Sequence, residues 1–176
     1  MEINIISVGK LKERYLQEGI DEFIKRLRPY TRVNIIEIAD ERIPANPSAK
    51  EQIHDQSEIS ARCSIRKEQE AIKEREGERI LNSLTERSYV IALDVKGKPM
   101  TSEGLARSIK NLQVSGYSSI SFIIGGALGL GKEVLKRADF RLSLSHMTFT
   151  HQMVRLILLE QVYRSFRIIR GEPYHL

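Results

Sequence analysis

Short apolar runs alternate along this chain with segments whose apolar residues recur every three or four positions. The apolar runs predict strands over residues 3–8, 33–39, 90–95, 120–124 and 140–144. Lys96 to Pro99 is expected to be a turn that closes the strand at 90–95. The segments between the strands predict helices over about 16–27, 102–114, 133–137 and 150–169. This alternation predicts an α/β fold, a mainly parallel sheet with helices on both faces.

The segment from residue 46 to residue 88 departs from this pattern, because it is crowded with charges and carries few apolar residues. Ile65, Ile72 and Leu81 leave only a narrow apolar stripe, so the second half is expected to be a largely solvated helix. Residues 47–64 are expected to form a charged surface insertion, an exposed loop and not a binding site.

Length and composition fit one globular domain. The 176 residues are close to the usual size of a single domain. Apolar residues make up 41% and charged residues 29%, which is typical of a folded chain and argues against disorder. The sequence contains no internal repeat. We therefore expect one domain over residues 1–176.

Cysteine and histidine content limits the metal sites that the chain could form. Cys63 is the only cysteine, which excludes an intramolecular disulfide and every cysteine-rich zinc module. His146, His151 and His175 all lie in the last 31 residues, but their spacing matches no zinc signature. We expect no metal.

Hydropathy gives no sign of a membrane segment. The longest wholly apolar run near the C-terminus is Leu156–Leu159, far short of a membrane span. No signal peptide is readable at the N-terminus. We expect a cytoplasmic protein with no membrane partner.

The net charge of +5 permits a polyanionic partner, and the distribution of the basic residues along the chain supports this interpretation. Between Lys132 and Arg170 there are eight Lys or Arg residues against three acidic residues. An RNA phosphate backbone is the kind of partner that such a region would bind.

A glycine cluster over residues 125–131 follows an expected strand and precedes an expected helix. Ligands in open α/β sheets bind outside the carboxyl ends of the strands, so we expect a small molecule here. A tight connection without a ligand is the alternative. Glu133 stands where a Walker A loop needs Ser or Thr, and the spacings do not give G-x-G-x-x-G. A nucleoside triphosphate or NAD is therefore not expected.

The last helix combines polar residues with an unusually apolar circumference. His151 and Arg155 are four residues apart and share one face, while Glu160 and Arg164 are spaced to pair on the opposite side. The apolar residues between them predict burial on more than one side, and hence a homodimer. A central core helix within a monomer is the alternative.

Several motifs together resemble the ribosomal RNA large subunit methyltransferase H family. They are Val8-Gly9-Lys10, Leu93-Asp94-x-x-Gly97-Lys98, Gly125-Gly126-x-x-Gly129, Leu144-Ser-His-Met-Thr-Phe149, Gln152-x-x-Arg155, Glu160-Gln161-x-Tyr163-Arg164 and Pro173-Tyr174-His175. The resemblance covers nearly the whole chain except about 47–64. It implies a SPOUT methyltransferase with a C-terminal trefoil knot, acting as a homodimer. It also implies transfer of a methyl group from S-adenosylmethionine to N3 of a pseudouridine in 23S rRNA, and we expect the assembled ribosome to be the substrate.

The resemblance also assigns site residues. The cofactor-binding residues would be Leu93, Gly125, Gly126, Leu144, Ser145, His146, Met147, Thr148 and Phe149. The catalytic residues would be His151, Arg155, Tyr174 and His175. A histidine would accept the N3 proton, Arg155 would stabilise the resulting anion, and Tyr174 would stack on an RNA base.

Two positions depart from the family pattern. Thr150 stands where proline usually precedes the motif histidine, although threonine is a good helix N-cap. Leu176 stands where a basic residue is common. The alternatives in function are a transfer-RNA methyltransferase of the same fold and an RNA-binding knot protein without catalytic activity.

Overall fold

The computed structural model describes residues 1–42 and 57–173, with residues 57–63 described as backbone only. The strands are β1 (Glu2–Val8), β2 (Arg32–Ile38), β3 (Ser88–Pro99), β4 (Ser119–Ile124) and β5 (Phe140–Ser143). The helices are α1 (Arg14–Leu27), α2 (Ser57–Asn82), α3 (Ser102–Val114), α4 (Lys132–Arg137) and α5 (His151–Ile169).

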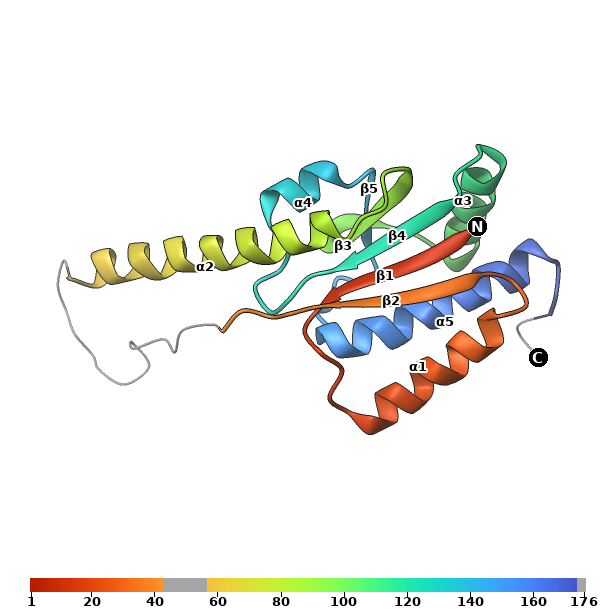
Figure 1. Cartoon of the computed structure of the whole chain (residues 1–176), viewed down its shortest axis with the longest axis horizontal. Coiled ribbons are helices and arrows are strands. Elements are labelled where there is room, and N and C mark those ends of the chain that lie inside the picture. Colours follow the sequence, from red (N-terminus) through yellow and green to blue (C-terminus); the bar gives the residue numbers. More distant parts are fainter. Residues whose placement is uncertain (43–56, 174–176) are drawn as a thin grey trace.

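The strands form one sheet in the order β2-β1-β4-β3-β5 (Figure 1). Every pair of neighbouring strands is parallel, and β1 lies in continuous register with both neighbours, so that Ile5 stands beside Ile35 and Phe122. The predicted α/β fold with a parallel sheet is confirmed.

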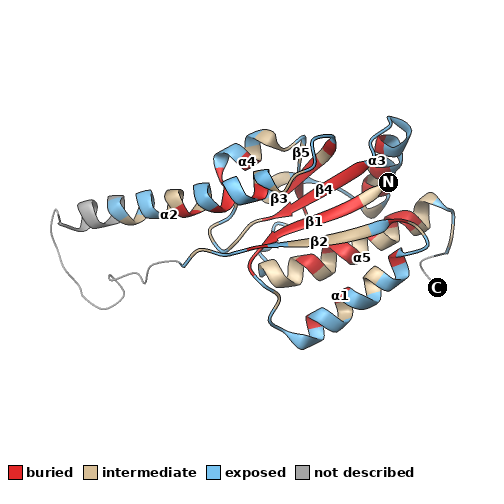
Figure 2. Cartoon of the chain, viewed as in Figure 1, coloured by how far each residue is buried: buried red, intermediate tan, exposed pale blue. Residues whose placement is uncertain are grey.

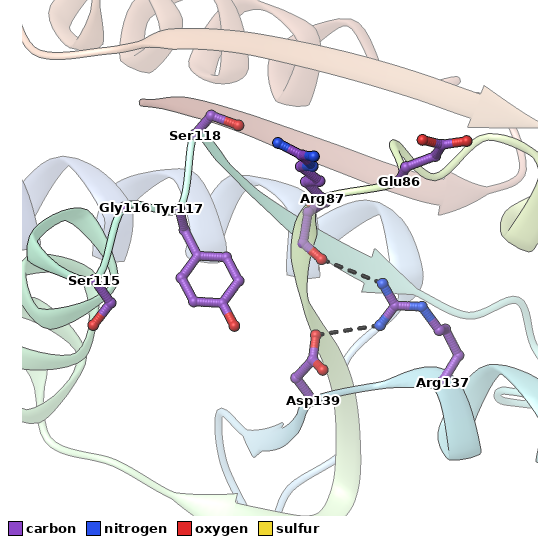
Figure 3. Close-up of a pocket in the computed structure, with 9 residues that line it drawn as sticks. Glu86, Arg87, Ser115, Gly116, Tyr117, Ser118, Arg137 and Asp139 are labelled. Atoms are coloured by element: carbon purple, nitrogen blue, oxygen red, sulfur yellow. Dashed lines mark hydrogen bonds and ion pairs between the residues drawn. The ribbon is translucent and has the colours of Figure 1, made fainter.

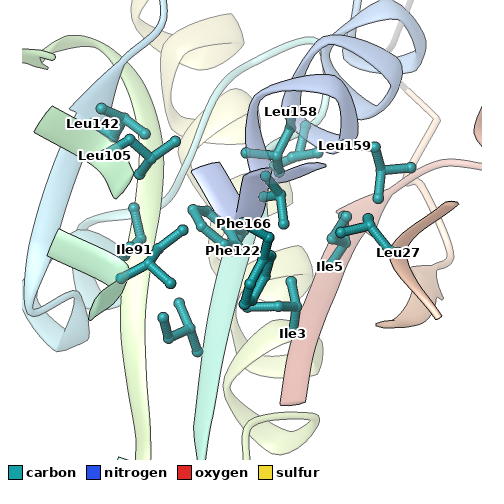
Figure 4. Close-up of a cluster of buried hydrophobic side chains, with 14 of the residues drawn as sticks. Ile3, Ile5, Leu27, Ile91, Leu105, Phe122, Leu142, Leu158, Leu159 and Phe166 are labelled. Atoms are coloured by element: carbon teal, nitrogen blue, oxygen red, sulfur yellow. The ribbon is translucent and has the colours of Figure 1, made fainter. Parts of the chain in front are cut away.

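Alternate residues of strands β1 to β4 enter separate cores on the two faces of the sheet. Ile3 and Ile5 of β1 pack with residues of α1, α3 and α5, a cluster shown in Figure 4. Ile6 and Val8 pack on the other face against residues of α2 and α4. This is the period-two geometry of a strand, and it confirms the expectation of helices on both faces.

Helix α5 lies against α1, α3 and the sheet, and Leu158, Leu159, Val162 and Phe166 are buried there. The expected pair between Glu160 and Arg164 forms at 2.6 Å. Packing within one chain thus accounts for much of the apolar surface that predicted a dimer, so this surface does not by itself favour a dimer.

The expected turn at 96–99 is wrong, because β3 continues to Pro99. The pairing of β3 with β5 shifts between Leu93 and Lys98, after which Lys98 and Pro99 lie opposite Leu142 and Ser143. A Cβ on Gly97 would stand 2.6 Å from the carbonyl oxygen of Arg141, so the close approach of the two backbones requires glycine there.

Helix α2 begins at Ser57, so residues 57–64 belong to a helix and not to the expected loop. Residues 47–56 of the predicted insertion lie outside the described residues. Most described side chains of α2 are exposed or intermediate, as expected for a solvated helix (Figure 2). Its buried face is formed by Ile72, Glu76 and Ile80. None of the helices in the described residues combines the length and hydropathy needed to cross a membrane.

Candidate functional site

A cavity of about 490 Å³ opens at the carboxyl ends of β4 and β5 and at residues 93–95 of β3, beside the first turn of α5. Its lining residues are Leu93, Asp94, Val95, Ile124, Gly125, Gly126, Ala127, Gly129, Leu142, Leu144, Ser145, Met147, Thr148, Phe149, Thr150, His151, Gln152 and Val154. This is the edge of the sheet where the position of the glycine cluster predicted a ligand site.

The structure brings together eight of the nine residues expected to bind the cofactor. Leu93, Gly125, Gly126 and five residues of the 144–149 segment line the cavity, whereas His146 is not among the lining residues. Met147 and Phe149 line it while remaining 72% and 41% exposed. Large apolar side chains that remain exposed at a cavity suit contact with an apolar ligand group.

The glycine loop, which we define as residues 125–131, is folded tightly on itself. The N–H of Gly129 donates a hydrogen bond of 3.0 Å to the carbonyl of Gly126. A Cβ on Gly125 would stand 2.9 Å from the carbonyl carbon of Gly129, and one on Gly126 would stand 3.0 Å from Val8 Cγ1. These glycines are therefore required by packing, while their backbone also forms the cavity wall.

Asp94 is a charged residue of this cavity that sequence reasoning did not select. It forms an ion pair with Arg141 of the neighbouring strand β5. Burial raises the pKa of Asp94, but the hydrogen bond from the Lys96 N–H and the Arg141 guanidinium outweigh it and leave the pKa below its usual value. The sequence signal was a lone carboxylate at the end of the apolar run 90–95.

His151 begins α5 and lines the cavity. The Thr150 side chain accepts a hydrogen bond of 3.3 Å from the Met153 N–H, which confirms that threonine caps this helix. Burial, and next the charge of Arg155, lower the pKa of His151 below 6.5. The imidazole is therefore mainly neutral at pH 7 and can accept a proton.

Gly9 lies directly against His151, a contact that the sequence did not indicate. A Cβ on Gly9 would stand 3.0 Å from the Nε2 atom of His151, and the φ of Gly9 is +84°. Glycine is thus required both by the backbone conformation and by the imidazole. The sequence signal was the Gly9-Lys10 turn that ends the first strand.

Arg155 does not reach the cavity. Its side chain is 1% exposed, forms an ion pair of 2.7 Å with Glu37, and donates hydrogen bonds to the carbonyl oxygens of Gly9 and Val8. The expectation that Arg155 contacts substrate is at odds with this arrangement, because its guanidinium is already bound to Glu37 and to the backbone at the end of β1. The helical spacing correctly placed His151 and Arg155 on one face, but it could not show that β1 ends beside them.

The other two expected catalytic residues, Tyr174 and His175, lie outside the described residues. In the described part of the chain, no group of three or more His, Cys, Asp or Glu residues is placed to hold a metal ion.

A second cavity of about 510 Å³ lies at the amino ends of the strands, and its lining includes Arg87, Tyr117, Arg137 and Asp139 (Figure 3). Arg137 forms an ion pair of 3.3 Å with Asp139 and donates a hydrogen bond to the carbonyl of Ser88. These charges satisfy each other, and the cavity lies at the edge of the sheet opposite to that favoured for ligands. The cavity beside His151 is therefore the candidate site.

Comparison with known proteins gives full-length matches. The sequence matches the family described as predicted SPOUT methyltransferase over residues 1–175. It is 61% identical over 175 residues to the ribosomal RNA large subunit methyltransferase H of Halothermothrix orenii, and 55% identical over 176 residues to that of Alkaliphilus oremlandii. It is 53% identical over 175 residues to that of Clostridioides difficile. Each match covers 99% of both chains.

Each of these relatives is more than half identical to this chain over its full length, and the family match leaves out a single residue. The protein is therefore a methyltransferase that belongs to the SPOUT family.

Proposed function

We propose that this protein transfers the methyl group of S-adenosylmethionine to N3 of a pseudouridine in 23S rRNA, and that the assembled ribosome is its substrate. The observation that carries the proposal is the cavity beside His151 in a chain so similar to enzymes named ribosomal RNA large subunit methyltransferase H. A cytoplasmic location, a C-terminal trefoil knot and a homodimer belong to the same proposal.

The lining residues fit S-adenosylmethionine. The cavity falls within the roughly 300–1,000 Å³ that small-molecule sites occupy. Leu93, Leu142 and Leu144 offer an apolar surface to the adenosyl group. When bound, the cofactor supplies an electrophilic methyl group on a sulfonium.

The proposed role of His151 follows from the chemistry of the target atom. The N3 atom of a uracil ring carries a proton and is a poor nucleophile until that proton leaves. The neutral imidazole of His151 lines the cavity and can accept the proton. Because Gly9 and the capped first turn of α5 fix the imidazole, this chain contributes orientation as well as a base.

The proposed roles of Tyr174 and His175 are best met by a second chain. The 19 residues of α5 span about 28 Å, with the cavity at the first turn and Pro173 beyond the last. We therefore propose that Tyr174 and His175 act on the cavity of a partner chain and not on that of their own. In a homodimer, the same residues of the partner can complete it.

Mass spectrometry of rRNA from a strain lacking this protein tests the proposal. We expect one methylated pseudouridine of 23S rRNA to lose its methyl group, and an unchanged pattern would overturn the proposed function. Purified protein and labelled S-adenosylmethionine are then given assembled ribosomes, free 23S rRNA or transfer RNA. Labelling of transfer RNA alone would instead support the transfer-RNA alternative, and no labelling at all would support the non-catalytic one.

A matched pair of variants tests the site itself. His151→Ala should lower methyl transfer to ribosomes by roughly 10²–10⁴-fold, whereas Arg14→Ala, at an exposed position outside the cavity lining, should retain it. Equal activity of the two variants would contradict the assignment of His151.

A further inference from the structure

Helix α2 carries a carboxylate on its buried face. Ile72, Glu76 and Ile80 are four residues apart, so they share one side of the helix, and none is more than 5% exposed. Among the Asp and Glu side chains that the structure describes, that of Glu76 is the one in the buried core. Burial of a carboxylate costs free energy unless it gains compensating contacts.

The two oxygens of Glu76 face two different segments of the chain. The Oε1 atom accepts a hydrogen bond of 3.0 Å from the N–H of Glu41, just beyond the end of β2. The Oε2 atom lies 3.1 Å from the point where a Cβ on Gly126 would stand. Glu76 therefore lies between the chain that leaves β2 and the glycine loop that lines the cavity.

Two other residues of α2, one turn before and one turn after Glu76, contact the same two segments. A Cβ on Gly131, at the other end of the glycine loop, would stand 2.8 Å from the carbonyl oxygen of Lys73. On the β2 side, Arg79 forms an ion pair of 2.5 Å with the Glu41 carboxylate and donates a hydrogen bond to the Ala39 carbonyl. The turns of α2 around Lys73 and Glu76 thus pack against the glycine loop.

We propose that Glu76 is a positioning residue for the cofactor cavity, holding Gly126 at a fixed distance from the segment 39–41. Glu76 is not among the residues that line the cavity, so it acts through Gly126 and not by contact with the cofactor. The inference rests on the proposed function, because it takes this cavity to be the site of S-adenosylmethionine.

Calorimetric titration of three variants with S-adenosylmethionine tests the proposal. Glu76→Ala removes the side chain that packs against Gly126 and should weaken binding of S-adenosylmethionine about tenfold or more. Glu76→Gln keeps the size and the acceptor oxygen, so its affinity should stay within about twofold of wild type. Ile80→Ala opens a cavity one turn further along the same face and should lower the midpoint of unfolding without changing affinity. Equal affinity losses in Glu76→Ala and Ile80→Ala would overturn the proposal.

Titration with S-adenosylhomocysteine, which lacks the sulfonium charge, separates positioning from a direct charge effect. A positioning role predicts that Glu76→Ala weakens binding of both ligands by the same factor. A loss confined to S-adenosylmethionine would overturn the proposal, because the Glu76 charge would then act on the ligand itself.

A double-mutant cycle tests the contact with Gly126. When Glu76 is unchanged, the methyl group that Gly126→Ala adds meets both Glu76 Oε2 and Val8 Cγ1. Glu76→Ala removes one of these obstacles, so the double variant should lose less affinity than the product of the two single losses. Losses that multiply would show that the two sites are independent and would overturn the proposal.

Hydrogen exchange of the ligand-free protein distinguishes failure of this inference from failure of the proposed function. Glu76→Ala should speed amide exchange in residues 125–131, whereas Ile80→Ala should not. If wild type binds no S-adenosylmethionine, the proposed function fails, but the exchange result still decides whether Glu76 holds the loop.

Discussion

The guanidinium of Arg155 and the carboxylate of Glu37 form an ion pair of 2.7 Å between residues 118 positions apart. The same Glu37 oxygen accepts a hydrogen bond of 2.9 Å from the Leu11 N–H, and Arg155 also holds the carbonyl of Gly9. The start of α5 is thereby fixed to the turn after β1, and that turn contacts His151. This arrangement fits a role of Arg155 in supporting the proposed base through the backbone.

Arg155→Ala should lower the free energy of unfolding by about 3 kcal/mol, because it removes the guanidinium that donates to two buried carbonyl oxygens and pairs with Glu37. Arg14→Ala is the matched control, since Arg14 forms an exposed pair with Glu18 and its loss should cost at most about 0.5 kcal/mol. Urea denaturation of both variants measures the difference. Equal unfolding midpoints for Arg155→Ala and wild type would contradict the assigned role.

Most of the architecture could be predicted because burial on both faces gives the central strands β1 and β4 nearly continuous apolar runs. Residues 120–124 were enough to predict β4, and the periodicity over 102–114 predicted α3 with its ends. The turn expected at Lys96–Pro99 was wrong because its Gly97 accommodates the backbone of Arg141, 44 positions away. A contact between residues so far apart in the sequence cannot be predicted from the local pattern.

The candidate site was predictable in its lining and not in its support. The position of the glycine cluster after a strand located the cavity, because strand ends collect ligands. The supporting roles of Gly9 and Glu37 could not be predicted, since they depend on which strands are neighbours in the sheet. The burial of Glu76 could not be predicted either, because a carboxylate in a segment rich in charges predicts solvent exposure.

The contact between Gly9 and His151 predicts a specific effect of an added methyl group. Gly9→Ala strains a backbone at φ +84° and brings a methyl group to 3.0 Å from Nε2, which should displace the imidazole and lower the methyl-transfer rate. Gly116→Ala is a close control, because its φ is +83° and nothing lies within 4 Å of the added Cβ. Both variants should lose about 1–2 kcal/mol of stability. Equal transfer rates in the two variants would refute the contact's importance.

The lowered pKa of His151 predicts how activity depends on pH. A base must be unprotonated, so the single-turnover rate should fall in acid with a midpoint below pH 6.5 and should be level above it. His151→Ala should remove this dependence and lower the rate by roughly 10²–10⁴-fold. Binding of S-adenosylmethionine, measured separately, should change little. A pH profile shared by wild type and variant would assign the base elsewhere.

Glu76 predicts an unusual dependence of stability on pH. Burial is the main cause that raises its pKa above 4.5, so the folded state holds the proton more tightly than the unfolded state. Wild type therefore loses stability as pH rises through this range, and Glu76→Gln escapes that loss. The stability advantage of Glu76→Gln should grow as the pH rises above 4.5, as measured by urea midpoints.

Glu22→Gln is the control of opposite sign for that experiment. The hydrogen bond from Arg26 lowers the pKa of Glu22, so wild type gains from this group as pH rises and the variant should fall behind. A constant difference between Glu76→Gln and wild type over the whole range would contradict the burial of a titrating carboxyl.

The length of α5 predicts that two defective chains restore one another. His151→Ala damages the cavity and His175→Ala damages the tail, so each homodimer should be nearly inactive. In a mixture, each mixed dimer pairs an intact cavity with an intact tail from the other chain. Random assortment should give about a quarter of wild-type methyl transfer, because half of the dimers are mixed and each has one complete site. Mixing His151→Ala with a chain that carries both substitutions should restore nothing, and failure of the first mixture, with chain exchange verified, would show that the site is built from one chain.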